Sequence, residues 1–259
     1  MARLTKLSRS IEGKVAIVTG AASGMGRATA QLFADEGAHV AVTDLDPERV
    51  AAVVDEISAA GGSAHGWKLD VTDAGDRDTV CRAVIERWGG IDILVNNAGI
   101  AIETPVDAED FEGIWSKTLA VLLTAQVQLI RDCLPALEKS GGGRIVNIAS
   151  TEGLGATKGI SPYTAAKTGV IGLTRSLAVE LAPRSITVNC ICPGPIRTGM
   201  TDAIPEDAKK EFARRRVALK RYGDPEEVAH GTLNFVLPAS SYITGAVLPV
   251  DGGLTIKNA

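Results

Sequence analysis

A tyrosine and a lysine four residues apart, Tyr163 and Lys167, are well suited to proton transfer. Both fall near the start of a predicted helix over residues 161–181, so their side chains share one face. An ammonium group beside a phenol favours the phenolate and lowers the phenol pKa from about 10 towards the working pH. Such a tyrosine can serve as general base in alcohol oxidation or general acid in carbonyl reduction. An exposed helix can also carry this spacing without a function.

Ser150 precedes Tyr163 by thirteen residues and follows a predicted strand over residues 144–149. Sites in open α/β sheets are built at the carboxyl ends of strands. The Ser150 hydroxyl could therefore hold the oxygen that reacts. Glu152, two residues later, either borders a substrate pocket or faces solvent.

A glycine-rich segment, TGAASGMG, lies between a predicted strand (14–19) and a predicted helix (24–36). Its glycines would let the backbone approach a pyrophosphate, and the helix N-terminus offers N–H groups and a favourable dipole. The spacing is GxxxGxG rather than the common GxGxxG, and glycine loops also make plain turns. The segment therefore predicts a dinucleotide site mainly through its position between strand and helix.

Asp44 closes the second predicted strand, eighteen residues after Gly26. A carboxylate there can accept hydrogen bonds from an adenosine ribose and repels a 2′-phosphate. Residues 21–23 and 43–46 contain no arginine that would bind such a phosphate. The sequence therefore favours NAD over NADP.

Predicted strands and helices alternate along almost the whole chain, which indicates βαβ units and a parallel sheet covered on both faces. We expect an N-terminal extension over residues 1–13 and one dinucleotide-binding and catalytic domain over residues 14–259. The polar segment at about 198–223 interrupts the alternation and is interpreted as a lid over the ligand crevice. The expected strands are 14–19, 39–43, 64–69, 92–95, 144–149, 185–191 and 246–250. The expected helices are 24–36, 47–60, 74–88, a long region ending near 139, 161–181 and 225–237.

Composition narrows the possible classes of protein. The 259 residues carry a formal net charge of −4 and are 45% hydrophobic, which suits one large α/β domain. The mild acidity argues against nucleic-acid or anionic-membrane partners. No stretch approaches the roughly 20 apolar residues of a membrane span, and the first fourteen residues do not resemble a signal peptide. The four cysteines lack metal-ligand spacing, so we expect no metal site, reduced packing residues and a cytoplasmic protein.

Seven features together resemble the classical short-chain dehydrogenases/reductases, in the order that this family shows and from residue 14 to about 253. They are TGAASGMG, Asp44, Asp70-Val71, the NNAG at 96–99, Ser150, Tyr163-x-x-x-Lys167 and the PGPIRT at 193–198. The resemblance implies a single Rossmann-type domain, with a doubly wound parallel sheet of about seven strands. It also implies a homotetramer.

The resemblance implies cofactor-binding residues at the ends of several strands. The pyrophosphate would lie on Gly20, Ser23, Gly24, Met25 and Gly26. The adenosine end would be bound by Asp44 at the ribose and by Asp70 and Val71 at the adenine. The nicotinamide end would contact Asn97, Tyr163, Lys167, Ile196 and Thr198.

The resemblance also implies three catalytic residues. Tyr163 would be the acid/base, Lys167 would lower its pKa and hold the nicotinamide ribose, and Ser150 would orient the substrate oxygen. The family's further catalytic asparagine, separated from a tryptophan by six residues, is replaced here by Leu122 after Trp115. Leucine keeps the backbone carbonyl that this position contributes to a proton relay, but it lacks the side-chain amide.

The sequence therefore predicts an NAD(H)-dependent oxidoreductase that interconverts a small-molecule secondary alcohol and a ketone. One alternative is a 3-oxoacyl-thioester reductase, although that activity usually uses NADPH, which Asp44 disfavours. Another alternative is a non-catalytic NAD-binding scaffold, to which only Leu122 points.

Overall fold

The computed structural model describes residues 5–258, and within them seven strands form one parallel sheet. The strand order is β3-β2-β1-β4-β5-β6-β7, so the order in which strands are added to the sheet reverses between β1 and β4. Ligand crevices of such sheets open at the carboxyl ends of the strands beside this reversal. The strands are β1 Val15–Thr19, β2 His39–Asp44, β3 Ser63–Lys68, β4 Ile93–Asn96, β5 Arg144–Ile148, β6 Thr187–Pro193 and β7 Val247–Val250. The predicted doubly wound parallel sheet is confirmed.

The central strands form because short β-branched and apolar runs are buried on both faces, as is usual in parallel sheets. Every residue of β1, β4, β5 and β6 is buried, whereas β3 and β7 lie at the two edges and are partly exposed. β6 begins two residues later than expected. Ser185, with φ at 59°, still belongs to the turn that ends the preceding helix, so the strand cannot start there.

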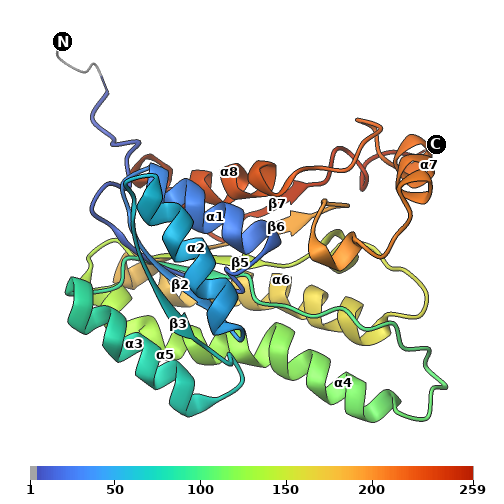
Figure 1. The fold of residues 1–259 in the computed structure, drawn as a ribbon, viewed down its shortest axis with the longest axis horizontal. Helices are drawn as coiled ribbons and strands as arrows, with labels where there is room; N and C mark the ends of the chain where they lie inside the picture. The colour runs from blue at the N-terminus through green and yellow to red at the C-terminus, as the bar shows by residue number, and fades with distance from the viewer. Residues whose placement is uncertain (1–4, 259) are drawn as a thin grey trace.

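Helices cover both faces of the sheet (Figure 1). One core joins alternate β1 residues, Ala16 and Val18, to the helices α1, α2 and α8. The other core joins Ile17 to α3, α5 and α6. The helices are α1 Gly24–Asp35, α2 Pro47–Ala59, α3 Ala74–Trp88, α4 Phe111–Leu119, α5 Ala125–Lys139, α6 Ser161–Leu181, α7 Glu206–Arg216 and α8 Pro225–Val236. This is a single Rossmann-type domain.

The long helical region over residues 111–139 is interrupted. A π-helical segment, Ala120–Thr124, separates α4 from α5. Contrary to the expectation from the sequence, the whole run is long and apolar enough to cross a membrane by length and composition. Core helices of soluble proteins pass the same test, and here Leu129, Ile130 and Leu137 pack into the core under the sheet.

The segment at 198–223 contains α7 and a short 3-10 turn, Gly199–Thr201. Its two ends are held together, because Ile196 pairs with Gly223 in an isolated parallel bridge. A small cluster of Ala213, Val217 and Tyr222, with Leu254 against it, anchors the segment to the chain after β7. The segment is therefore an insertion that packs against the chain after β7 and whose two ends lie next to each other at the sheet.

Candidate active site

The glycine loop between β1 and α1 has a backbone that side chains would obstruct. Gly20 and Gly24 have φ of 63° and 53°, in the left-handed region that favours glycine. A Cβ at Gly26 would lie 2.1 Å from the Gly20 carbonyl oxygen, so the first turn of α1 touches the loop directly. These contacts give the close backbone approach that a bound pyrophosphate requires.

The N-terminus of α1 keeps its donors available. Ser23 is the N-cap residue, but its side chain makes no capping hydrogen bond to the first turn. The leading N–H groups of a helix have no partner within it, so a cap, water or an anion must satisfy them. Thr198 lies against this turn, since a Cβ at Gly24 would be 3.1 Å from its Cγ2. Met25, in the same turn, is half-buried. The predicted pyrophosphate residues and Thr198 therefore lie together.

Asp44 lies at the carboxyl end of β2, next to the glycine loop. Its Oδ2 accepts a hydrogen bond from the Ala22 N–H (3.2 Å), and its Oδ1 accepts one from the Leu45 N–H (2.7 Å). The carboxylate is half-buried and fixed, with lone pairs left to accept from a ribose hydroxyl. The residues therefore fit an adenosine ribose.

Asp70 and Val71 follow β3 on the neighbouring strand end, and both are half-buried. The Asp70 Oδ1 accepts from the backbone N–H and hydroxyl of Thr72, and these hydrogen bonds hold the pKa of Asp70 below its usual value. The Val71 carbonyl accepts from Arg77 (3.0 Å). The loop is thus braced by its own polar contacts, beside the place where an adenine would extend from Asp44.

The two asparagines after β4 have different partners. The Asn97 amide donates to the carbonyls of Thr19 (2.8 Å) and Gly20 (3.1 Å), so it ties the end of β4 to the glycine loop. Asn96 donates to the Asn147 side chain (2.9 Å) and joins β4 to β5. Asn97 therefore holds the glycine loop in place, and Asn96 holds β4 and β5 together.

Ser150 and Tyr163 meet at the carboxyl end of β5. The Ser150 Oγ accepts a hydrogen bond from the Glu152 N–H (3.1 Å), which leaves the hydroxyl hydrogen free to donate. Burial raises the pKa of the Tyr163 phenol above its usual value, a hydrogen bond with Ser150 lowers it, and the charge of Glu152 raises it. The serine is therefore near enough to the tyrosine to influence the pKa of its phenol.

Lys167 lies one turn further along α6 and is buried. Its Nζ donates to the Ile148 carbonyl (2.8 Å) and lies 5.5 Å from the centroid of the Tyr163 ring. Burial lowers the pKa of the Lys167 ammonium to about 8, against the opposing effect of the nearby sulfur atoms of Cys190 and Cys192. The lysine thus sits behind the phenol, with two of its three N–H donors left for other partners.

The expectation that Lys167 lowers the pKa of Tyr163 is not met in this structure. Burial is the largest influence on the phenol and acts in the opposite direction, and Lys167 is not among the causes of its shift. The physical reason is desolvation, which penalises both the phenolate and the ammonium. The sequence places the two groups four residues apart but does not reveal how deeply they are buried.

Leu122 lies inside the π-helical segment between α4 and α5 and is fully buried. Its side chain packs on the turn after β4, since a Cβ at Gly99 would lie 3.2 Å from its Cδ2. The helix is therefore opened at this position although the residue is leucine. A π segment inside a helix often marks a functional site.

Other residues support the site without a motif that identifies them in the sequence. A Cβ at Gly153 would lie 2.8 Å from the Lys167 carbonyl oxygen, so this glycine lets the turn after Ser150 pack on α6. The Thr157 hydroxyl donates to the Glu152 Oε1 (2.9 Å). Only the glycine could have been noticed in the sequence, as a small residue three positions after Ser150.

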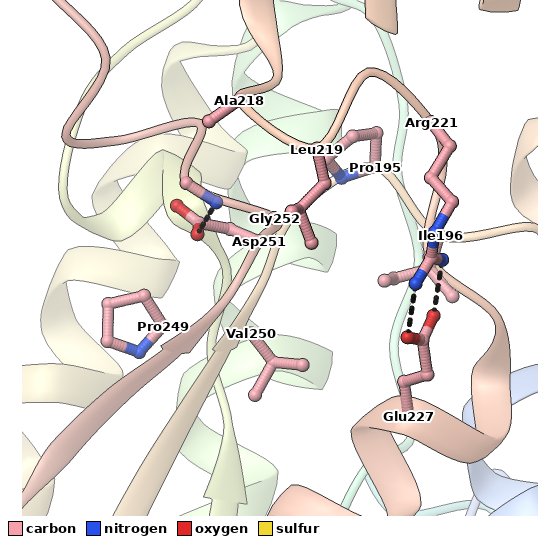
Figure 2. A pocket seen from close by; sticks show the side chains of 12 residues that line it. Pro195, Ile196, Ala218, Leu219, Arg221, Glu227, Pro249, Val250, Asp251 and Gly252 are labelled. Carbon is pink, nitrogen blue, oxygen red and sulfur yellow. Dashed lines mark hydrogen bonds and ion pairs between the residues drawn. The ribbon is translucent and has the colours of Figure 1, made fainter.

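A cavity of about 460 Å³ opens where the segment at 198–223 returns to the sheet (Figure 2). Its lining includes Ile196, Leu219 and Asp251. One wall is formed by the ion pair of Arg221 with Glu227. The hydrogen bond from Arg221 lowers the pKa of Glu227 to about 2. Among the described residues, its lining includes neither Ser150 nor Tyr163. The cavity therefore lies at the base of the excursion, next to Ile196.

The fold and this arrangement define a Rossmann-type α/β protein with a dinucleotide-type loop. A family model described as enoyl-(acyl carrier protein) reductase matches residues 20–255. A 3-oxoacyl-[acyl-carrier-protein] reductase, FabG, from Thermotoga maritima is 42% identical over 249 residues, covering 95% of this chain and 99% of that protein. A 2,5-dichloro-2,5-cyclohexadiene-1,4-diol dehydrogenase, LinX, from Sphingobium indicum is 40% identical over 250 residues, covering 96% and 99%.

Solved structures agree with these sequence matches. A crystal structure of a short-chain type dehydrogenase/reductase from Mycobacterium marinum superposes with a TM-score of 0.89 at 33% identity, covering 96% of this chain and 98% of that one. The chain belongs to the classical short-chain dehydrogenases/reductases, a family of oxidoreductases that bind a nicotinamide cofactor.

Proposed function

We propose that this protein is an NAD(H)-dependent oxidoreductase that interconverts a small-molecule secondary alcohol and a ketone, with Tyr163 as general acid/base. The observation that carries the proposal is the assembly of Ser150, Tyr163 and Lys167 at the carboxyl end of β5, at the same edge of the parallel sheet as the glycine loop. This is where parallel α/β sheets bind ligands.

The proposed cofactor-binding residues are those of the glycine loop and the neighbouring strand ends. NAD is supported over NADP by the fixed carboxylate of Asp44, next to which a 2′-phosphate would be repelled. The proposed set is Gly20, Ser23, Gly24, Met25, Gly26, Asp44, Asp70, Val71, Asn97, Tyr163, Lys167, Ile196 and Thr198.

The proposed mechanism follows from the donors and acceptors of three side chains. The bound nicotinamide supplies the two-electron hydride acceptor for the carbinol carbon, or the hydride donor in the reverse direction. The Ser150 hydroxyl, which already accepts from Glu152, donates to the substrate oxygen. The Tyr163 phenolate takes the substrate hydroxyl proton during oxidation and returns it during reduction. Lys167, anchored on the Ile148 carbonyl, would hold the nicotinamide ribose with its remaining N–H donors.

The remaining proposals concern the protein as a whole. We propose a cytoplasmic homotetramer in which the segment at 198–223 covers the substrate. The proposal that this segment covers the substrate is supported by the pairing of Ile196 with Gly223, which joins its two ends at the sheet.

A second candidate activity is reduction of a 3-oxoacyl thioester. It is favoured by the 42% identity to the Thermotoga maritima 3-oxoacyl-[acyl-carrier-protein] reductase. Asp44 opposes it if that reaction uses NADPH. A non-catalytic NAD-binding scaffold remains the third candidate, and the assembled Ser150, Tyr163 and Lys167 oppose it.

Spectrophotometric turnover assays distinguish these candidates. The purified protein is given NAD or NADP with a panel of secondary alcohols, and NADH or NADPH with ketones and a 3-oxoacyl thioester. The proposal expects turnover of alcohols and ketones with NAD(H). Thioester reduction with NADPH as the best reaction would support the second candidate, and cofactor binding without any turnover would support the scaffold.

A further inference from the structure

Arg77 is a buried arginine near the start of α3, next to the loop 70–73 that follows β3. Arginine is seldom buried unless its charge is paired. The N-terminus of a helix also carries a partial positive charge, so the helix dipole does not favour a cation there. The cost of placing Arg77 at this position must therefore be offset by contacts outside α3.

The guanidinium of Arg77 joins two segments that are far apart in the sequence. Its Nη1 donates to the Val71 carbonyl (3.0 Å), and its Nε donates to the Asp132 Oδ2 on α5 (2.8 Å). Asp132 is partly exposed, so it balances the buried charge without losing all of its own hydration. Because the guanidinium is planar and its donors form a fixed fork, both bonds require one relative position of the loop and α5. Arg77 therefore fastens the loop 70–73 to α5.

The loop 70–73 lies beside the carboxylate proposed for the adenosine ribose. The Leu69 N–H donates to the Asp44 carbonyl (2.8 Å), so the loop starts next to the end of β2. The Asp70 N–H donates to the Asp76 Oδ2 on α3 (2.9 Å). These two bonds hold the start of the loop, and the bond from Arg77 holds the carbonyl of the next residue. The bond from Arg77 thus adds α5 to the elements that fix this loop.

We propose that Arg77 is a positioning residue that holds the loop 70–73 for the adenine end of the cofactor, with Asp132 keeping its guanidinium oriented. This inference rests on the proposed cofactor site and adds to it two residues that need not touch the cofactor. Without Arg77 the Val71 carbonyl loses this donor, and the loop has to be ordered when the adenine binds, which weakens binding. The reacting end of the cofactor is proposed to lie at other strand ends, so kcat should not change.

The test uses two competitive inhibitors that each represent one half of NAD. AMP carries the adenine half, and nicotinamide mononucleotide carries the nicotinamide half. Arg77→Met should raise the KM for NAD and the inhibition constant of AMP by about tenfold, and it should leave kcat and the inhibition constant of nicotinamide mononucleotide within about twofold. Calorimetric titration measures the affinity for NAD, AMP and nicotinamide mononucleotide independently of turnover.

A conservative variant separates positioning of the loop from stabilisation of the fold. Arg77→Lys keeps a positive charge for Asp132, but one ammonium cannot fill both positions of the fork. Its Tm should therefore stay close to that of the wild type, while its affinity for AMP falls as in Arg77→Met. A merely structural role would make the affinity follow the Tm.

Arg82→Met is the matched control. Arg82 lies on the same helix and pairs with Asp78, but this ion pair is exposed and connects α3 only to itself. The substitution is chemically the same as Arg77→Met, and exposed pairs contribute little. It should leave Tm, kcat and the affinities for both inhibitors unchanged.

The possible failures are distinguishable. Wild-type affinity for AMP in Arg77→Met, or equal losses for AMP and nicotinamide mononucleotide, overturns this inference while turnover still supports the proposed function. If Arg77→Met does not fold, as judged by circular dichroism, Arg77→Lys decides, and wild-type AMP affinity in that variant overturns the inference. If the protein binds NAD without turnover, the proposed function fails and the calorimetric affinities decide this inference. A protein that binds no nicotinamide nucleotide overturns both.

Discussion

Replacing Leu122 by asparagine should destabilise the protein and leave its turnover almost unchanged. Leu122 is fully buried and packs on the turn at Gly99. Losing the buried leucine surface and burying an amide without arranged partners should together cost about 3–5 kcal/mol. At about 2–4 °C per kcal/mol for a domain of this size, Tm should fall by roughly 10 °C.

Turnover should change by less than about threefold, because the helix is already opened at this residue. The π-helical segment Ala120–Thr124 exists with leucine in place, and a side-chain change leaves the backbone carbonyl of residue 122 where it is. Circular dichroism gives Tm, and kcat is measured well below the unfolding transition of the variant, with saturating cofactor and substrate.

Two neighbouring substitutions control this experiment. Leu122→Met conserves side-chain volume, so it should lower the free energy of unfolding by less than about 1.5 kcal/mol and leave kcat unchanged. Leu123→Asn places the same amide one residue later, where the side chain faces Gly169 on α6, and should not raise kcat either. A tenfold rise in kcat for Leu122→Asn alone would refute this reasoning, because it would show that proton transfer limits turnover for want of the amide.

Three further outcomes are expected. The wild type should prefer NAD to NADP by roughly a hundredfold in kcat/KM, and Asp44→Ala should narrow that ratio mainly by weakening NAD; a wild type that prefers NADP contradicts the interpretation of Asp44. Gly26→Ala should weaken NAD binding in a calorimetric titration, since a Cβ would lie 2.1 Å from the Gly20 carbonyl oxygen; wild-type affinity would contradict this. In the folded state Lys167 has its pKa lowered to about 8 from 10.5, so its burial costs stability below pH 8, and that cost is relieved as the pH rises to 10.5. The difference in Tm between Lys167→Met and the wild type should therefore be most in favour of the variant below pH 8, and it should shift in favour of the wild type as the pH rises to 10.5. A difference in Tm that does not vary with pH would contradict the lowered pKa of Lys167.

The architecture could be predicted because its elements are encoded locally. β-branched runs such as VAIVT specify buried strands, and the helix Ser161–Leu181 matches the predicted range. The π-helical segment could not be predicted, because the apolar pattern of residues 111–139 continues through it. β6 starts two residues later than predicted because Ser185 lies in a left-handed turn, and nothing in the residue types there predicts that turn.

The candidate site divides in the same way. The order of motifs along the chain, through its resemblance to the short-chain dehydrogenases/reductases, named Ser150, Tyr163 and Lys167 as candidates; the spacing of Tyr163 and Lys167 alone would not have done so. The raised pKa of Tyr163 and the contact of Arg77 with Asp132 could not be predicted, because they depend on burial and on contacts between separate segments. The sequence thus names the chemical groups, whereas their burial in the fold decides the direction in which their pKa values shift.

The central claim is that Tyr163 transfers the proton, and Tyr163→Phe tests it directly. The substitution removes only the phenolic hydroxyl and keeps the ring that Lys167 faces at 5.5 Å. The measurement is kcat on the best alcohol substrate, with NAD affinity determined separately by calorimetric titration. The account predicts a fall in kcat of about 10²–10⁴-fold with NAD affinity near that of the wild type. A variant that binds NAD normally and retains most of its kcat would contradict the account.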